Sequence, residues 1–251
     1  MKEINFVFSS KAIETAKLMK EIARNSFNLK LNMYKNTTDI DLRDDNNETI
    51  YYGFGDNFDL NKDETAELID EFDILPNTII KDDDEIDDFD TILIKNPVRI
   101  MLYKDAKDLY ETMYKFIKNK KEWRINYSWG KVNSILLKNL DGNVFGKQKN
   151  CNWLREDNRN TRDFLREITK QIADVLDLEH FGLDIIYDID ENIYYFLEVN
   201  RANGLNEEGC YYFLRGFMDK MGWYYEERNC LQQNCDIVRN REWIDIREIN
   251  W

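Results

Sequence analysis

Two apolar runs separated by a short polar turn are the feature of this sequence that most constrains its fold. Residues 183–189 and 193–200 are rich in Ile, Tyr and Phe, and three polar residues lie between them. Aliphatic and aromatic runs that flank such a turn predict an antiparallel hairpin. If the turn is centred on Glu191 and the hairpin has no bulge, Asp184 lies directly opposite Glu198.

The predicted pair of carboxylates needs a positive partner. Opposed strand residues have Cβ atoms about 4.5–5.5 Å apart, and like charges placed so are destabilising unless something binds between them. Asn200 shares the face of Glu198, which adds a third oxygen donor of the kind that magnesium prefers. Because magnesium is usually bound together with substrate phosphates, Asp184, Glu198 and Asn200 predict a metal site with a phosphorylated co-substrate. Two other interpretations stay open, exposed sheet carboxylates and a glycosidase-like carboxylate pair.

The rest of the chain predicts a mixture of strands and helices. A strand at 4–8 precedes a helix that Ser10 is expected to cap, and this order is typical of an α/β beginning. The whole pattern predicts an α+β or α/β fold. Its other expected elements are helices after residue 61, at 161–178 and beyond 209, strands at 50–54 and 91–94, and a hairpin or meander over 122–138.

The charge balance limits the partners of the chain. With 35 Lys and Arg against 49 Asp and Glu, its formal net charge is −14. Nucleic acids and anionic membrane surfaces both bind basic patches, so neither is expected as a partner outside a locally basic groove. The densest acidic run, 82–90, lacks the central glycine and closing glutamate of a calcium loop and predicts a solvated loop. The same charge leaves open an acidic protein that mimics DNA.

Histidine and cysteine usage excludes several kinds of site. His180 is the only histidine, which excludes His-rich zinc sites and predicts a structural role for this residue. The four cysteines show no CxxC spacing, and the first ten residues lack the apolar core of a signal peptide. No run approaches the roughly 20 apolar residues of a membrane span. We therefore expect a cytoplasmic location, in the host if the chain is viral, and attach no oligomeric state to the chain.

Four segments carry a resemblance to a known family. Residues 181–187, followed by 197–205 with Glu198-Val199-Asn200 and Gly204-Leu205, resemble the magnesium-binding end of ATP-grasp enzymes. The likeness is to the short RimK-like carboxylate–amine ligases of phages and bacteria. Residues 122–125 resemble the acidic-aromatic-Arg-aliphatic strand of that family, and 91–97 resemble the strand that delivers its ATP lysine.

The resemblance implies a fold, a reaction and a set of site residues. Two α+β subdomains would clamp ATP, and Mg²⁺ and ATP would activate a carboxylate as an acyl phosphate that an amine attacks. The substrates would be small-molecule or peptide carboxylates and amines. The implied metal ligands agree with the hairpin argument. By resemblance, the site residues are Asp184, Glu198 and Asn200 for magnesium, Lys95 for ATP phosphates, Tyr114, Lys115, Phe116 and Ile117 in the adenine-binding hinge at 113–117, and Arg124 and Lys138 for the phosphate or acyl phosphate.

The resemblance also implies domain limits and one departure. We expect a truncated α/β region at 1–60, a small ATP-grasp subdomain at 61–118, and a larger subdomain at 119–251. In the family a glycine-rich lid follows the first lysine, but no glycine occurs here between Lys95 and Gly130. A nucleotide-binding relative without ligase activity therefore stays open as an alternative. Arg155, Arg159 and Arg201 are weaker candidates for binding a substrate carboxylate.

Overall fold

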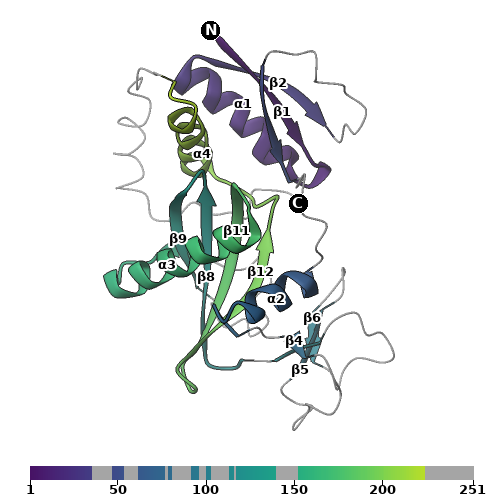
Figure 1. Ribbon diagram of the computed structural model, residues 1–251, viewed down its shortest axis with the longest axis vertical. Coiled ribbons are helices and arrows are strands. Elements are labelled where there is room, and N and C mark those ends of the chain that lie inside the picture. Colours follow the sequence, from purple (N-terminus) through teal and green to yellow (C-terminus); the bar gives the residue numbers. More distant parts are fainter. Residues whose placement is uncertain are drawn as a thin grey trace.

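The computed structural model describes residues 1–35, 47–53, 62–76, 79–80, 92–95, 100–102, 113–115, 117–139 and 152–223 (Figure 1). Within these residues the strands form one parallel and two antiparallel sheets. The predicted mixed α and β architecture is confirmed.

A three-stranded parallel sheet forms the N-terminal part of the molecule. β1 (Lys2–Phe8) lies between β2 (Leu29–Lys35) and β3 (Glu48–Tyr52), and its last five residues are all buried. The predicted helix is present as α1 (Ile13–Phe27), but it follows a 3₁₀ turn at Ser10–Ala12 and has no side-chain cap from Ser10. The sequence argument therefore placed the start of this helix a few residues too early.

The N-terminal sheet and α1 share their core with a helix from the far end of the described chain. α4 (Glu207–Lys220) packs beside α1 in the upper part of Figure 1. Phe213, Leu214 and Phe217 of α4 belong to the same buried cluster as Phe6 and Met19. Residues from both ends of the described chain therefore hold the N-terminal sheet in place.

A five-stranded antiparallel sheet carries the predicted site. Its order is β10-β9-β8-β11-β12, so the two predicted hairpins lie side by side, with β8 paired to β11. Both hairpins are confirmed. The strands are β8 (Lys120–Ser128), β9 (Lys131–Asn139), β10 (Asn152–Arg155), β11 (His180–Asp188) and β12 (Ile193–Asn200).

The two faces of this sheet differ in chemistry because strand side chains alternate. Trp123, Ile125, Leu183 and their neighbours form an apolar core on one face. α3 (Arg159–Leu176) and α2 (Lys62–Glu71) cover that face (Figure 1). No helix in the described part of the chain is long and apolar enough to span a membrane.

The register of the β11–β12 hairpin confirms the predicted pairing of Asp184 with Glu198 but differs from the predicted register in the rest of the hairpin. Asp184 lies opposite Glu198, but the register shifts beside Asp184, so Ile185 faces Phe196. Leu197 is the extra residue of this bulge. The prediction of one uniform register was wrong, because Asp188 accepts hydrogen bonds from the backbone of the turn and centres it half a residue earlier. The bulge then restores the predicted pairing at Asp184.

The remaining strands form a four-stranded sheet with the order β4-β7-β5-β6. α2, from the same predicted subdomain, packs instead against α3 and β12 in the core of the five-stranded sheet. The domain limits stay a prediction. The strands of this sheet are β4 (Ile79–Ile80), β5 (Ile92–Lys95), β6 (Ile100–Leu102) and β7 (Met113–Lys115).

Candidate active site

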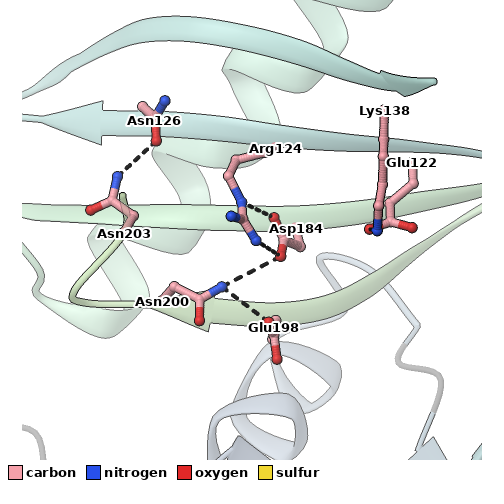
Figure 2. Close-up of polar contacts among 8 residues, drawn as sticks. All are labelled: Glu122, Arg124, Asn126, Lys138, Asp184, Glu198, Asn200 and Asn203. Atoms are coloured by element: carbon pink, nitrogen blue, oxygen red, sulfur yellow. Dashed lines mark hydrogen bonds and ion pairs between the residues drawn. The ribbon is translucent and has the colours of Figure 1, made fainter. Parts of the chain in front are cut away.

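A row of charged and polar side chains crosses the face of the five-stranded sheet that α2 and α3 leave uncovered. Every second residue of the central strands points to this face, because the intervening residues fill the core. Figure 2 shows these side chains converging from four neighbouring strands. They are Lys138 on β9, Glu122 and Arg124 on β8, Asp184 on β11, and Glu198 and Asn200 on β12.

Arg124 and Asp184 form a bidentate ion pair at the centre of this face. They are direct neighbours across β8 and β11. Nε of Arg124 lies 2.8 Å from Oδ1 of Asp184, and a terminal nitrogen lies 2.5 Å from Oδ2 (Figure 2). Only 4% of the Asp184 side chain and 15% of the Arg124 side chain are exposed. Burial lowers the pKa of Arg124, but the charge of Asp184, its hydrogen bonds with Arg124, and the charges of Glu198 and Glu122 together raise the pKa by more, so the net shift is upward.

Asn200 connects the two predicted metal-binding carboxylates. Its side-chain amide donates to Glu198 over 3.1 Å and, at the longer distance of 3.4 Å, to Asp184 (Figure 2). One amide group therefore touches both carboxylates that the register places opposite each other. The three predicted ligands are brought together in space.

Lys138 and Glu122 form a second ion pair on the same face. Lys138 donates to Glu122, and only 8% of each side chain is exposed. Burial lowers the pKa of the neighbouring Lys120; Glu122 opposes this shift and the charge of Lys138 adds to it. The face is therefore densely charged and largely shielded from water.

Trp153 is a site residue that the sequence analysis missed. It lies on β10 opposite Lys138, and its ring centre is 5.3 Å from the Arg124 guanidinium carbon and 5.8 Å from the Lys138 ammonium. Both distances are within the range of cation–π attraction. The four-residue strand β10 gave no periodic signal in the sequence, because alternation needs a longer run to be recognised.

A chain of hydrogen bonds fixes the turn that follows Asn200. The Tyr52 hydroxyl donates to Asn203, whose amide donates to Asn126 over 2.7 Å, and Asn126 donates in turn to Ser134. Figure 2 shows the Asn203–Asn126 bond beside the ion pair. Gly182 permits this contact, since a Cβ there would lie 2.7 Å from the Cβ of Asn203. The N-terminal sheet therefore helps to position the end of β12.

The donor set on this face fits a divalent cation. The described residues contain no group of three or more His, Cys, Asp and Glu side chains arranged to hold a metal. Two carboxylates and an amide oxygen, supplied if the Asn200 amide turns over, are hard oxygen donors that suit magnesium with retained waters and phosphates. Arg124, Asp184 and Glu198 together carry a charge of −1, so a divalent cation would leave a positive site for an anion.

The other predicted site residues belong to the segments at and after β5 and β7. Lys95 ends β5 opposite Ile100 of β6, and Tyr114 of β7 pairs with Leu93 of β5. Lys115 is likewise in β7, and Phe116 lies outside the described residues. Ile117 is buried against Ile186, Tyr195 and Leu197. Ile186 lies two positions after Asp184 in β11, so Ile117 packs on the face of the sheet that carries Asp184.

Two of the weaker arginine candidates, Arg155 and Arg159, and the histidine contact residues outside the row of charged and polar side chains. Arg155 pairs with Glu208 at the start of α4, and Arg159 belongs to α3, on the opposite face of the sheet. Both ring nitrogens of His180 are buried without a hydrogen-bond partner, and its ring stacks on Tyr52. This agrees with the structural role expected for His180.

Comparison with known proteins identifies the fold. No protein-family model and no curated protein sequence matches the chain. Among solved structures, D-alanine–D-alanine ligase from Bacillus anthracis complexed with ATP is similar, with 13% identity, a TM-score of 0.63, and 88% of this chain and 97% of that chain covered. The ATP-grasp ligase PsnB, complexed with a minimal precursor, Mg and ADP, has 12% identity and a TM-score of 0.61 over 87% and 98% of the chains. L-amino acid ligase from Bacillus licheniformis has 13% identity and a TM-score of 0.53 over 85% and 69%. The chain therefore has the ATP-grasp fold.

Proposed function

We propose that this protein is an ATP- and magnesium-dependent ligase that joins a carboxylate to an amine. The observation that carries the proposal is the convergence of Asp184, Glu198 and Asn200 on one sheet face beside Arg124 and Lys138. Hard oxygen donors next to fixed cations suit a metal-bound polyphosphate. The same fold in ligases with ATP, or with Mg and ADP, supports this function.

The proposed reaction has two steps that share one site. A carboxylate oxygen of the first substrate attacks the γ-phosphorus of ATP, and ADP leaves, so an acyl phosphate forms. The amine then attacks the acyl carbon, phosphate leaves, and the amine loses a proton as the amide forms. Bound magnesium would neutralise charge on the phosphates, as cations do in phosphoryl transfer generally.

Residues of this chain would orient the phosphates and shield them from water. Arg124 is held between Asp184 and Trp153, and Lys138 between Glu122 and Trp153, so both cations lie on the charged face before a substrate arrives. Cations on this face would stabilise negative charge that develops on the transferring phosphoryl group. Lys95 would contact the phosphates from β5, and residues 113–117 would hold the adenine.

The sequence supports a more specific proposal for the kind of ligase and its substrates. Residues 181–205 resemble the RimK-like ligases of phages and bacteria, whose substrates are carboxylates and amines of small molecules or peptides. Among the described residues Cys210 is a free, buried thiol, which agrees with the proposed cytoplasmic location.

Trapping the intermediate tests the proposed ligase. With ATP, Mg²⁺, a carboxylate panel and hydroxylamine as the amine, we expect a hydroxamate together with ADP and phosphate. Glu198→Gln and Lys95→Ala should abolish the product, whereas Glu167→Gln, an exposed control on α3, should keep it. Nucleotide binding without any hydroxamate across a broad panel would instead favour a relative that binds ATP without ligating.

A further inference from the structure

The contacts of Asp184 set up a competition at the proposed metal site. Both of its carboxylate oxygens accept hydrogen bonds from Arg124, and the Asn200 amide contacts one of them as well. The side chain is almost fully buried, so water cannot compensate easily for a lost partner. A cation that ligates Asp184 must therefore displace or weaken a paired arginine.

Arg124 cannot release Asp184 by losing its proton. A guanidinium stays protonated in proteins, and a bidentate pair with a carboxylate is among the stronger polar contacts. A divalent cation at Asp184 would also lie within a few ångströms of the positive Arg124. In the nucleotide-free protein, both the lost hydrogen bonds and the repulsion act against metal binding.

A phosphate group would remove this obstacle. Trp153 lies over the guanidinium and keeps it at the site if its bond to Asp184 loosens. Arginine binds phosphate oxygens in the same two-pronged geometry with which it binds a carboxylate. A polyphosphate could therefore accept the hydrogen bonds of Arg124 and leave Asp184 available to the metal.

We propose that Arg124 is a switch that couples metal binding to nucleotide binding. Without nucleotide it occupies Asp184 and keeps the affinity for the divalent cation low. With nucleotide it transfers to a phosphate, so that metal and nucleotide each strengthen the binding of the other by the same factor. This inference rests on the proposed function, since it assumes that the site takes a magnesium nucleotide.

The direct test measures the metal alone. Mn²⁺ binding to the nucleotide-free protein, followed by electron paramagnetic resonance of free Mn²⁺, should be about tenfold tighter in Arg124→Met than in the parent. Lys138→Met is the matched control, because it removes a cation from the same face that pairs with Glu122 rather than Asp184. Lys138→Met should change the Mn²⁺ affinity by about twofold or less, since the charge of Lys138 is not in contact with Asp184 and acts on the metal more weakly.

A second variant guards against a folding defect. Arg124→Lys keeps the charge but loses the fork that holds both oxygens, so its Mn²⁺ affinity should fall between those of the parent and Arg124→Met. Circular dichroism of each variant is the check that it is folded. Equal or weaker Mn²⁺ binding in both Arg124 variants, or an equal gain in Lys138→Met, would overturn the switch.

The nucleotide arm separates this inference from the proposed function. The ADP affinity is measured with Mg²⁺ and with a chelator, and the gain from Mg²⁺ should be about tenfold smaller in Arg124→Met than in the parent. Formation of the Mg–ADP complex in solution affects the measured ADP affinity of both proteins equally, so it cancels in the comparison. If the parent binds Mg–ADP but both proteins gain equally from Mg²⁺, the switch fails and the function stands. If the parent binds no nucleotide, the function itself fails.

Discussion

Tyr52 and Asn203 are 151 positions apart in the chain, and a hydrogen-bonded contact joins them next to the charged site. The Tyr52 hydroxyl lies 2.5 Å from the backbone oxygen of Asn203 and 3.0 Å from its side-chain oxygen. Burial raises the pKa of Tyr52, and Cys210 adds to this shift, so the hydroxyl stays protonated and can donate. The last strand of the N-terminal sheet thereby holds the turn after Asn200.

Tyr52→Phe should destabilise the protein without disturbing its aromatic core. The ring would keep its contacts with Phe6 and His180, but the buried oxygens of Asn203 would lose their donor. An unsatisfied buried acceptor costs about 1–3 kcal/mol. Urea unfolding should show this loss, whereas Tyr51→Phe, at the exposed neighbouring position, should leave the midpoint unchanged. Equal effects at the two positions would contradict the assigned role.

Gly182→Ala should displace the same turn from the opposite side. The added methyl group would lie 2.7 Å from the Cβ of Asn203, which is a clash that only a backbone shift can relieve. Overpacking of this kind costs about 1–3 kcal/mol. Gly209→Ala is the control, because it lies in a helix and would meet Leu205 no closer than 3.1 Å. Thermal unfolding that ranks Gly182→Ala as the more stable of the two variants would refute this account of Gly182.

Asp184→Asn and Glu198→Gln should separate stability from metal binding. Asp184→Asn leaves the charge of Arg124 without its bidentate partner, and breaking a largely buried pair costs about 3 kcal/mol. Glu198→Gln keeps an oxygen that can accept from Asn200, so its loss of stability should be smaller. Both variants should lose the magnesium-dependent part of nucleotide binding. Chemical denaturation and ADP titration with and without Mg²⁺ check the two parts independently.

His180 should make the stability depend on pH below neutrality. Burial lowers its pKa from 6.5 to about 4, so between these values the unfolded chain binds a proton that the folded chain does not. The stabilisation is fully present above pH 6.5 and falls as the pH drops to about 4, by about 3 kcal/mol in total. His180→Phe should lose this dependence. The test is the difference in unfolding free energy between parent and variant from pH 4 to 8, and a constant difference would contradict the prediction.

The shared face of Glu198 and Asn200 could be predicted because side chains alternate along a strand. The pairing of Glu198 with Asp184 was predicted correctly only because the bulge at Leu197 offsets the half-residue shift of the turn. The bulge at Leu197 could not be predicted, because it depends on the turn at Asp188 and on a bond from the Phe196 amide to the carbonyl of Pro76. Distant contacts of this kind leave no periodic trace in the sequence.

Other parts were missed for different reasons. β2 was not predicted, although its first residues alternate between apolar and polar side chains as in a strand. The Tyr52–Asn203 bond and the position of Trp153 over Arg124 depend on tertiary packing between separate elements, which spacing along the chain does not encode. The charged face was therefore predictable as a set of residues, but its fixed ion pairs were not.

Thermal unfolding with ADP, in the presence and absence of Mg²⁺, tests the central claim most directly. A ligand that binds the native state stabilises it by RT ln(1 + [L]/Kd), which is about 2.7 kcal/mol at a hundredfold excess over Kd. We predict that ADP raises the unfolding temperature of the parent, that Mg²⁺ increases this shift, and that Glu198→Gln loses the increase. A parent protein whose unfolding temperature does not respond to ADP or ATP, with or without Mg²⁺, would contradict the claim that this site binds a magnesium nucleotide.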